Sequence, residues 1–241
     1  MTTKNKSTRM EQSMNVNYEE ISPSDIHISH VRGMISRSLD RISPDDAAYL
    51  FATGKSELEI RNALAIHLHH NLAPGQIAIR EWKRHDLAIL DSALHPLAII
   101  EGKVWSHTDV ITRQKLMNGS KSIRAELEND IRKLAEVTDT YSGVAGFITI
   151  VLFSIDIDES DSLVEYRDVV KYASLHRRGI KSMKGLENLM HDAHGKLNDL
   201  LNNYGEFIYL PLWAGSFHGM TVKSEIFILK PERTLLDEYR S

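Results

Sequence analysis

The apolar residues of this chain change their spacing at Pro74 and Gly75, and that change limits the possible folds more than any other feature. Before it, Ile60, Leu64 and Leu68 recur at helical intervals in SELEIRNALAIHLHHNL, which predicts a helix. After it come three short runs with polar connections: QIAIREW, HDLAILD and LAIIEGKVW. Runs of this length and pattern are typical of strands, so we expect one helix followed by three consecutive strands.

The rest of the sequence continues to alternate between helices and strands. Residues 120–138 return to helical spacing, and GVAGFITIVLFSID is then typical of a buried strand. Because a helix separates this strand from the one before it, we expect the two to be parallel. The other predicted elements are helices over 24–40, 44–52, 162–177 and 183–203, and strands in FIYLPLW and TVKSEIFIL. We therefore expect a single α/β domain over residues 21–241, with a flexible tail over 1–20.

Composition narrows the class of protein. The 241 residues are 42% hydrophobic and 26% charged, as in a soluble globular protein. The chain has no cysteine, which excludes disulfides and thiolate metal sites and agrees with a cytoplasmic location. We expect no secretory signal and no membrane span, because the N-terminus is polar and VAGFITIVLF is too short. A net charge of −4 argues against a wholly basic nucleic-acid binder but leaves room for a local basic groove.

The third predicted strand, within IIEGKVW, carries an acid and an amine in an apolar setting. Side chains of a strand alternate between its faces, so Glu101 and Lys103 share one face with Ile99 while Gly102 faces the other. Burying these charges costs free energy unless they pair or bind a ligand. Without a functional role, Glu101 and Lys103 would simply form a salt bridge on a half-exposed strand.

The order helix, strand, strand, strand, helix, strand resembles the core of the PD-(D/E)xK nuclease superfamily. The motifs that carry the resemblance are RHDLAIL, with Asp86, and IIEGKVW, with Glu101 and Lys103. The resemblance covers about residues 56–155. It implies an α/β fold with a restriction endonuclease-like αβββαβ core, in which a mixed central sheet is flanked by helices. Extra N-terminal and C-terminal helices would lie outside this core.

The chain departs from the superfamily pattern at two positions, and one choice stays open. His85 replaces the proline that names the motif, and Gly102 replaces an aliphatic residue. The glutamate of the first core helix is Glu57 or Glu59. We choose Glu57, which lies about 60° from Ile60 on a helical wheel and so falls within the apolar stripe. Glu59 remains the alternative. It is the less favoured choice because a structural role in a capping box would already account for it.

Hydrolysis of a phosphodiester requires an activated water and a means of neutralising charge on phosphorus. A divalent cation supplies both, and Mg²⁺ prefers carboxylate and carbonyl oxygens, with Mn²⁺ as a substitute. Neighbouring antiparallel strands can bring Asp86 and Glu101 within about 5 Å. We expect Asp86, Glu101, Glu57 and the carbonyl of Gly102 to be the ligands, and Lys103 to orient the water or stabilise negative charge. This interpretation requires the carboxyl groups of Asp86 and Glu101 to lie on the same side of the sheet.

Basic residues suggest where DNA would bind. The run KYASLHRRGIKSMK holds several basic residues and no acid, which suits a phosphate backbone, although a solvated loop would look the same. The basic residues that we assign to DNA are Lys121, Arg124, Arg177, Arg178 and Lys181. Trp105 and His107 either line the DNA cleft or close the core. Asp130 and Lys133 are most simply a pair on a helix surface.

The sequence therefore predicts a Mg²⁺-dependent endonuclease that cuts duplex DNA, of restriction type, with repair or junction cleavage as the alternative. Cutting both strands implies a homodimer. Two other classes remain: a catalytically silent DNA-binding module of the same fold, and a zinc hydrolase. The zinc alternative rests on His67, His69 and His70, but no third ligand is pre-arranged by spacing, and we expect His67 to pack on its helix.

Overall fold

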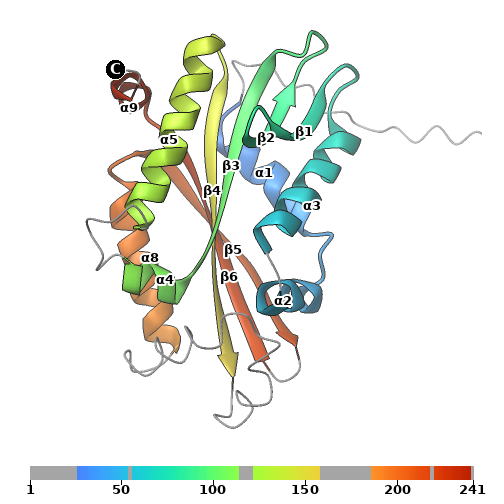
Figure 1. Cartoon of the computed structure of the whole chain (residues 1–241). Helices are drawn as coiled ribbons and strands as arrows, with labels where there is room; N and C mark the ends of the chain where they lie inside the picture. The colour runs from blue at the N-terminus through green and yellow to red at the C-terminus, as the bar shows by residue number, and fades with distance from the viewer. Residues whose placement is uncertain (1–25, 54–55, 114–121, 158–185, 218–219, 240–241) are drawn as a thin grey trace, which may run out of the picture.

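The computed structural model has one mixed, open β-sheet with helices on both faces (Figure 1). It describes residues 26–53, 56–113, 122–157, 186–217 and 220–239, so the predicted tail and the helix over 162–177 lie outside the described residues. The strands are β1 (Ile77–Trp82), β2 (His85–Leu90), β3 (Pro96–Ser106), β4 (Ala145–Ile157), β5 (Gly205–Phe217) and β6 (Met220–Pro231). The helices are α1 (Ile28–Leu39), α2 (Pro44–Thr53), α3 (Ser56–Asn71), α4 (His107–Arg113), α5 (Ile123–Thr140), α8 (Leu186–Leu201) and α9 (Arg233–Glu238).

The strand order β1-β2-β3-β4-β6-β5 combines antiparallel and parallel neighbours. β3 and β4 are parallel, as predicted, and the other neighbouring pairs are antiparallel. The predicted succession is present as α3, β1, β2, β3, α5 and β4, but α4 is inserted after β3 and was not predicted. A reciprocal cap begins α4: Asp109 N donates to Ser106 Oγ, and Ser106 N donates to Asp109 Oδ2.

Side-chain alternation divides the interior into two apolar layers. Leu87 of β2 and Ile100 of β3 pack with α1, α2 and α3 on what we call the α3 face. Ala88 and Ile99 pack with α4, α5 and α8 on the α5 face. The two groups of helices lie on opposite sides of the sheet in Figure 1. The strand pattern that predicted alternate faces for IIEGKVW is therefore confirmed for its apolar residues.

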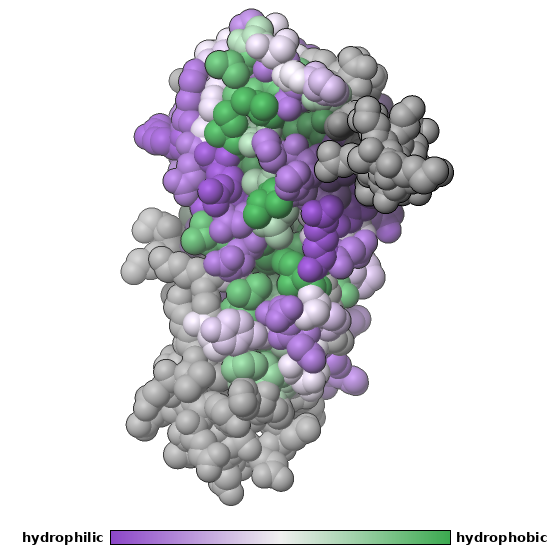
Figure 2. Space-filling model, turned by 90° about the vertical axis from the view of Figure 1, so that its right-hand side faces the viewer, coloured by the Kyte–Doolittle hydropathy of each residue, from purple (hydrophilic) through white to green (hydrophobic). Residues whose placement is uncertain are grey.

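The outer surface of α3 is not uniformly polar. Apolar residues point in more than one direction from this helix, and Leu58 and Ile66 remain exposed. Figure 2 shows this side of the molecule, where apolar and hydrophilic side chains lie interspersed. As expected, His67 is buried, whereas His69 and His70 are exposed. No helix within the described ranges is both long and apolar enough to cross a membrane.

Candidate functional site

The candidate site lies where β2 stops pairing with β3. The paired register ends at Leu87 and Ile100, while β3 continues to Ser106. Asp86 is the first residue beyond that register, and its carboxylate takes the place of a backbone partner. Its Oδ2 accepts a hydrogen bond of 2.8 Å from Gly102 N. A Cβ added at Gly102 would lie 3.6 Å from Asp86 Oδ2, an ordinary contact distance, so this hydrogen bond does not itself require a glycine.

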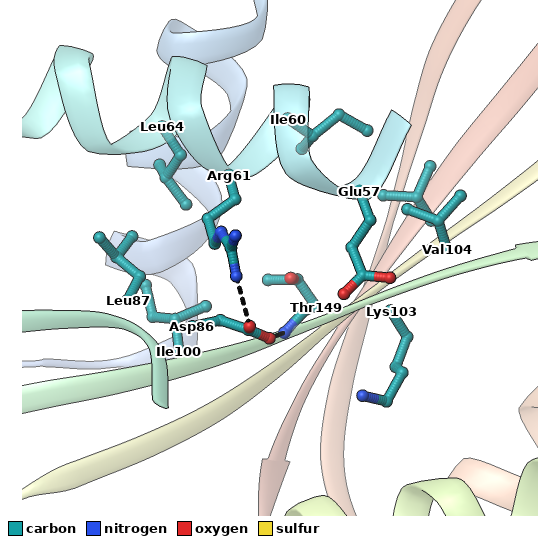
Figure 3. A pocket seen from close by; sticks show the side chains of 12 residues that line it. Glu57, Ile60, Arg61, Leu64, Asp86, Leu87, Ile100, Lys103, Val104 and Thr149 are labelled. Carbon is teal, nitrogen blue, oxygen red and sulfur yellow. Dashed lines mark hydrogen bonds and ion pairs between the residues drawn. The ribbon is translucent and has the colours of Figure 1, made fainter. Parts of the chain in front are cut away.

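Arg61 of α3 holds the other oxygen of Asp86 (Figure 3). Arg61 Nη1 lies 2.7 Å from Asp86 Oδ1, and Arg61 Nη2 lies 2.8 Å from Glu81 Oε1. The arginine and Asp86 side chains are only 15% and 20% exposed, whereas Glu81 is 71% exposed. Arg61 Nε is buried and has no hydrogen-bond partner. Asp86 is thus bound from the α3 face.

Glu57 lines the same pocket as Asp86 and Arg61, together with Gly102 and Lys103. Its carboxylate points from α3 towards β3 in Figure 3. Glu57 is solvent-exposed as a residue, but the packed side chains around its carboxyl partly desolvate that group and raise its pKa. The Lys103 ammonium opposes this rise, and the Asp86 carboxylate adds to it. Glu57 is therefore close enough to both groups to interact with them electrostatically.

Glu101 lies on the α5 face and is fully buried. Its Oε1 lies 2.6 Å from His85 Nδ1, and its Oε2 lies 3.3 Å from Lys133 Nζ of α5. Lys103 also reaches α5, where its Nζ lies 2.7 Å from Asp130 Oδ2. Burial works against the charge of Lys133, but Glu101 and Asp130 outweigh it and raise the pKa of Lys133. These residues form a chain of ion pairs between β3 and α5.

The structure does not bring the carboxyl groups of Asp86 and Glu101 together. Continued alternation from Ala88 and Ile99 would place both on the α5 face, but the strand pairing ends before Asp86 is reached. Arg61 and the Gly102 N–H then hold Asp86 on the α3 face, while Glu101 keeps its partners on the α5 face. The expectation that the carboxyl groups of Asp86 and Glu101 lie on the same side of the sheet is therefore wrong.

The donor set as arranged does not fit the predicted cation. Glu57 and Asp86 line one pocket, but Glu101 does not. Within the described ranges, no group of three or more His, Asp or Glu side chains is arranged to hold a metal ion. This finding covers His67, His69 and His70 as well, so the described histidines offer no zinc site.

The remaining sequence predictions have mixed outcomes. Asp130 is not on a helix surface: its side chain is only 1% exposed and binds Lys103 as well as Lys133. Trp105 is buried and donates to Glu126, but it also lines the large cavity along α5, whereas His107 is buried in the core. Arg124 is exposed on α5. The other basic residues assigned to DNA, Lys121, Arg177, Arg178 and Lys181, lie outside the described residues.

Sequence reasoning missed Arg61 and Lys133 as members of the site. Arg61 follows Glu57 by four positions, which places both on one side of α3 and could have identified it. Lys133 was noticed only as the neighbour of Asp130 on its own helix. Its contact with Glu101 joins residues far apart in the sequence, so local spacing carries no signal for it.

A second polar cluster lies on the α5 face, and we call it the histidine network. Ser154 Oγ lies 2.7 Å from His107 Nδ1, and His107 Nε2 lies 3.1 Å from Glu225 Oε1. His194 Nδ1 lies 3.1 Å from Glu225 Oε2. Burial would raise the pKa of Glu225, but the hydrogen bonds and charges of His107 and His194 outweigh it and lower this pKa.

Comparisons with known proteins found no match among family models, curated proteins or solved structures. The chemistry of the site therefore has to be argued from its own residues. Acidic groups, an ammonium and a guanidinium meet at an open strand edge beside a cavity of about 590 Å³, which Glu57, Lys103 and residues of α5 line. Such a set can bind a cation, an anion or both.

Proposed function

We propose that the chain is a metal-dependent nuclease that hydrolyses DNA phosphodiester bonds, most simply a restriction-type endonuclease that cuts duplex DNA. Its core, from α3 to β4, would be that of the restriction endonuclease-like fold. The observation that supports this proposal is the meeting of Glu57, Asp86 and Lys103 beside one pocket. These residues come from the helix and the two strands on which the resemblance places the catalytic groups.

The chain's own groups have suitable chemistry for this reaction. Glu57, with its raised pKa, suits a group that takes a proton from an attacking water. Lys103 would stabilise negative charge on the phosphate. We propose Mg²⁺, or Mn²⁺ in its place, as the cofactor, with Asp86, Glu57 and the Gly102 carbonyl as the ligands on the α3 face. Asp86 would have to leave Arg61 to bind it, and Glu101, which faces the other side of the sheet, would stay with Lys133.

A partner surface and an assembly belong to the same proposal. Arg124, which is exposed on α5 next to Ala125 of the large cavity, would contact the DNA backbone. The basic residues Lys121, Arg177, Arg178 and Lys181 would extend that contact. A homodimer would cut the two strands of the duplex, since each copy carries one site.

One observation favours a second candidate, a catalytically silent DNA-binding module of the same fold. Each charged residue of the two motifs has an ion-pair partner: Arg61 for Asp86, Lys133 for Glu101 and Asp130 for Lys103. Paired charges of this kind can serve the fold alone. This candidate predicts DNA binding without cleavage.

A cleavage assay separates the two candidates. We expect supercoiled plasmid to be nicked or linearised with Mg²⁺ and left intact with EDTA. Asp86→Asn and Lys103→Met should each lower the rate at least about 100-fold, because each removes a charge that the reaction uses. Asp192→Asn, an exposed aspartate of α8, is the matched control and should cut at the parent rate.

Two results would contradict the proposal or a part of it. Equal cutting by the parent, Asp86→Asn and Lys103→Met would overturn the assignment of the site. DNA binding by the parent without cleavage under either metal would support the silent module. Urea unfolding of each variant shows whether a lost rate reflects a lost fold.

A further inference from the structure

We propose that the tip of the β1–β2 hairpin, formed by Lys83 and Arg84, is a contact site for the sugar-phosphate backbone of duplex DNA. The tip comes directly before the start of β2, which carries Asp86, so it would hold the backbone beside the candidate site. This inference rests on the proposed function, because it names a DNA contact of the same site. The contact itself needs no metal ion.

The turn of this hairpin has a backbone conformation that its residues do not favour. Trp82 pairs with His85, and only two residues connect them. These residues, Lys83 and Arg84, have φ angles of 48° and 73°, both left-handed, as in a type I′ turn. Asn-Gly is the usual sequence of such a turn, because larger side chains adopt this conformation at a cost. The stability of the turn therefore does not account for two basic residues at the tip, and strain of this kind points to a function.

The basic side chains at this end of the hairpin carry positive charge that no acid of the described residues neutralises. Arg84 is exposed and has no side-chain partner in the part of the chain that the structure describes. Arg80 of β1 binds the neutral Asn62, and Lys83 donates to the neutral hydroxyl of Tyr141. Each basic residue of the candidate site, by contrast, has an acidic partner: Arg61, Lys103 and Lys133. Positive charge that is not neutralised attracts the phosphates of DNA.

Two aromatic rings hold the Lys83 side chain in place. Its Nζ lies 4.8 Å from the centre of the Trp82 ring and 4.9 Å from the centre of the Tyr141 ring. These contacts order the side chain without cancelling its charge. An ammonium has three N–H donors, and the Tyr141 hydroxyl accepts one of them. The other donors can bind phosphate oxygens with a smaller loss of conformational freedom than a mobile lysine would suffer.

The same rings favour contact with a duplex backbone over stacking on unpaired bases. The centre of the Trp82 ring lies 6.4 Å from that of His85, in a stacked arrangement, and 5.8 Å from that of Tyr141. With the Lys83 ammonium also over it, the Trp82 ring is occupied by the protein's own side chains. Binding of single strands relies on aromatic rings that are free to stack on bases. Trp82 therefore supports the tip, and phosphate is the group that the tip can bind.

Glu81 connects the hairpin to the candidate site. The strands pair on both sides of Glu81 and Asp86, but these two residues are passed over. Glu81 has a φ of 55°, so a left-handed residue also precedes the turn, and its carboxylate binds Arg61 at 2.8 Å. Arg61 in turn binds Asp86. Because β1 is the outermost described strand at this edge of the sheet (Figure 1), DNA held at the exposed tip would lie along the strand that carries Asp86.

Anisotropy titrations of a fluorescent DNA duplex, in EDTA and over a range of salt concentrations, test the inference. EDTA prevents cleavage, so the titration measures binding alone. The double variant Lys83→Asn/Arg84→Gly removes both charges and introduces the usual sequence of a type I′ turn. We expect it to bind the duplex at least about 10-fold more weakly at about 0.1 M salt. Its plot of log affinity against log salt should be shallower by about 2, because each lost phosphate contact removes about 0.9 from the slope.

Urea unfolding of the same variant separates a binding role from a structural one. Asn and Gly relieve the strain of the turn, so the midpoint of unfolding should rise above that of the parent while the DNA affinity falls. Lys83→Gln/Arg84→Gln removes the same charges but keeps the strain. We expect it to lose as much affinity without the rise in midpoint. A variant that gains stability and loses affinity has not lost binding through loss of the fold.

Arg32→Gln/Arg41→Gln is the matched control, because it also removes two exposed basic charges. Arg32 lies in α1 and Arg41 follows that helix, which packs on the α3 face. Trp82 of the hairpin packs on the α5 face. We expect this control to keep the affinity and the salt dependence of the parent.

The outcomes distinguish this inference from the proposed function when the plasmid assay is run on the same preparations. Cleavage by the parent, with duplex affinity unchanged in Lys83→Asn/Arg84→Gly, would overturn the role of the hairpin and leave the nuclease intact. Affinity that depends on the hairpin, in a protein that does not cleave DNA, would support the role of the hairpin and overturn the nuclease. Failure of the parent to bind the duplex, or tighter binding of the corresponding single strand, would overturn the inference.

Discussion

Glu101 and Glu225 occupy similar positions in two different regions of the molecule. Each is a buried glutamate of a central strand, and each lies between two basic groups on the α5 face. Glu101 lies between His85 and Lys133. Glu225 lies between His107 and His194. The chemistry of the two clusters is therefore alike, and the difference is in what surrounds them.

The surroundings of Glu225 are closed on the side of His107, whereas the His194 side chain on the other side is 31% exposed. His107 is fully buried, and its second ring nitrogen lies against Ser154, so this end of the network lies inside the protein. Near Glu101 the sheet opens where β2 leaves β3, and the neighbouring Glu57 and Lys103 line a cavity. Arg61, on the α3 face beside the same opening, keeps a buried N–H without an acceptor. The contacts of the histidine network are those of a cluster that stabilises the fold, whereas a cluster that borders a cavity and keeps an unpaired buried N–H can also bind a ligand.

The largest effect on stability is expected at Glu225. Glu225→Ala leaves His107 without its carboxylate in a buried position and should lower the free energy of unfolding by about 3 kcal/mol. Urea unfolding measures this change. The control is Glu206→Ala, an exposed glutamate of β5, which should change stability by less than about 0.5 kcal/mol. A loss below about 1 kcal/mol for Glu225→Ala would mean that the histidine network does not stabilise the fold.

A smaller effect is expected from acid. The folded-state pKa of Glu225 is lowered, so the unfolded chain binds the extra proton more readily as the pH falls. The stabilisation by Glu225 is therefore complete above the ordinary glutamate pKa of about 4.3 and is lost as the pH falls through the lower folded-state value. Urea unfolding of the parent and Glu225→Gln should show a difference of about 1 kcal/mol at pH 7 that shrinks below pH 4. A difference that grows towards acid pH would contradict the direction of the shift.

The parts of the fold that local patterns control were predictable from sequence. The helix before Pro74, the three strands after it and the parallel strand after the next helix are all present, because each depends on spacing within a few residues. The faces of β3 followed from alternation alone. The short helix α4 was missed, because seven residues give too few repeats to reveal a period.

The parts of the site that were mispredicted depend on contacts between distant segments. Whether Asp86 faces Glu101 depends on where the β2–β3 pairing ends and on Arg61 from α3, and neither is encoded near Asp86. Asp130 looked like half of a surface pair because its other partner, Lys103, comes from a strand that is remote in sequence. Residue types and their order predicted which charges belong to the region, but not how they pair.

The smallest effect on stability is expected at the exposed end of the open cluster. Arg61 binds Asp86 with both side chains mostly buried, but it binds Glu81 where the acid is 71% exposed. Water screens the second pair, so we expect a coupling energy below about 0.5 kcal/mol between Arg61 and Glu81. A double-mutant cycle with Arg61→Gln, Glu81→Gln and the double variant, measured by urea unfolding, gives this value. A coupling energy above about 1 kcal/mol would show that the contact between Arg61 and Glu81 stabilises the fold, as the histidine network does. The contrast between the two clusters would then not depend on exposure, because the exposed Glu81 would contribute as much as the buried Glu225.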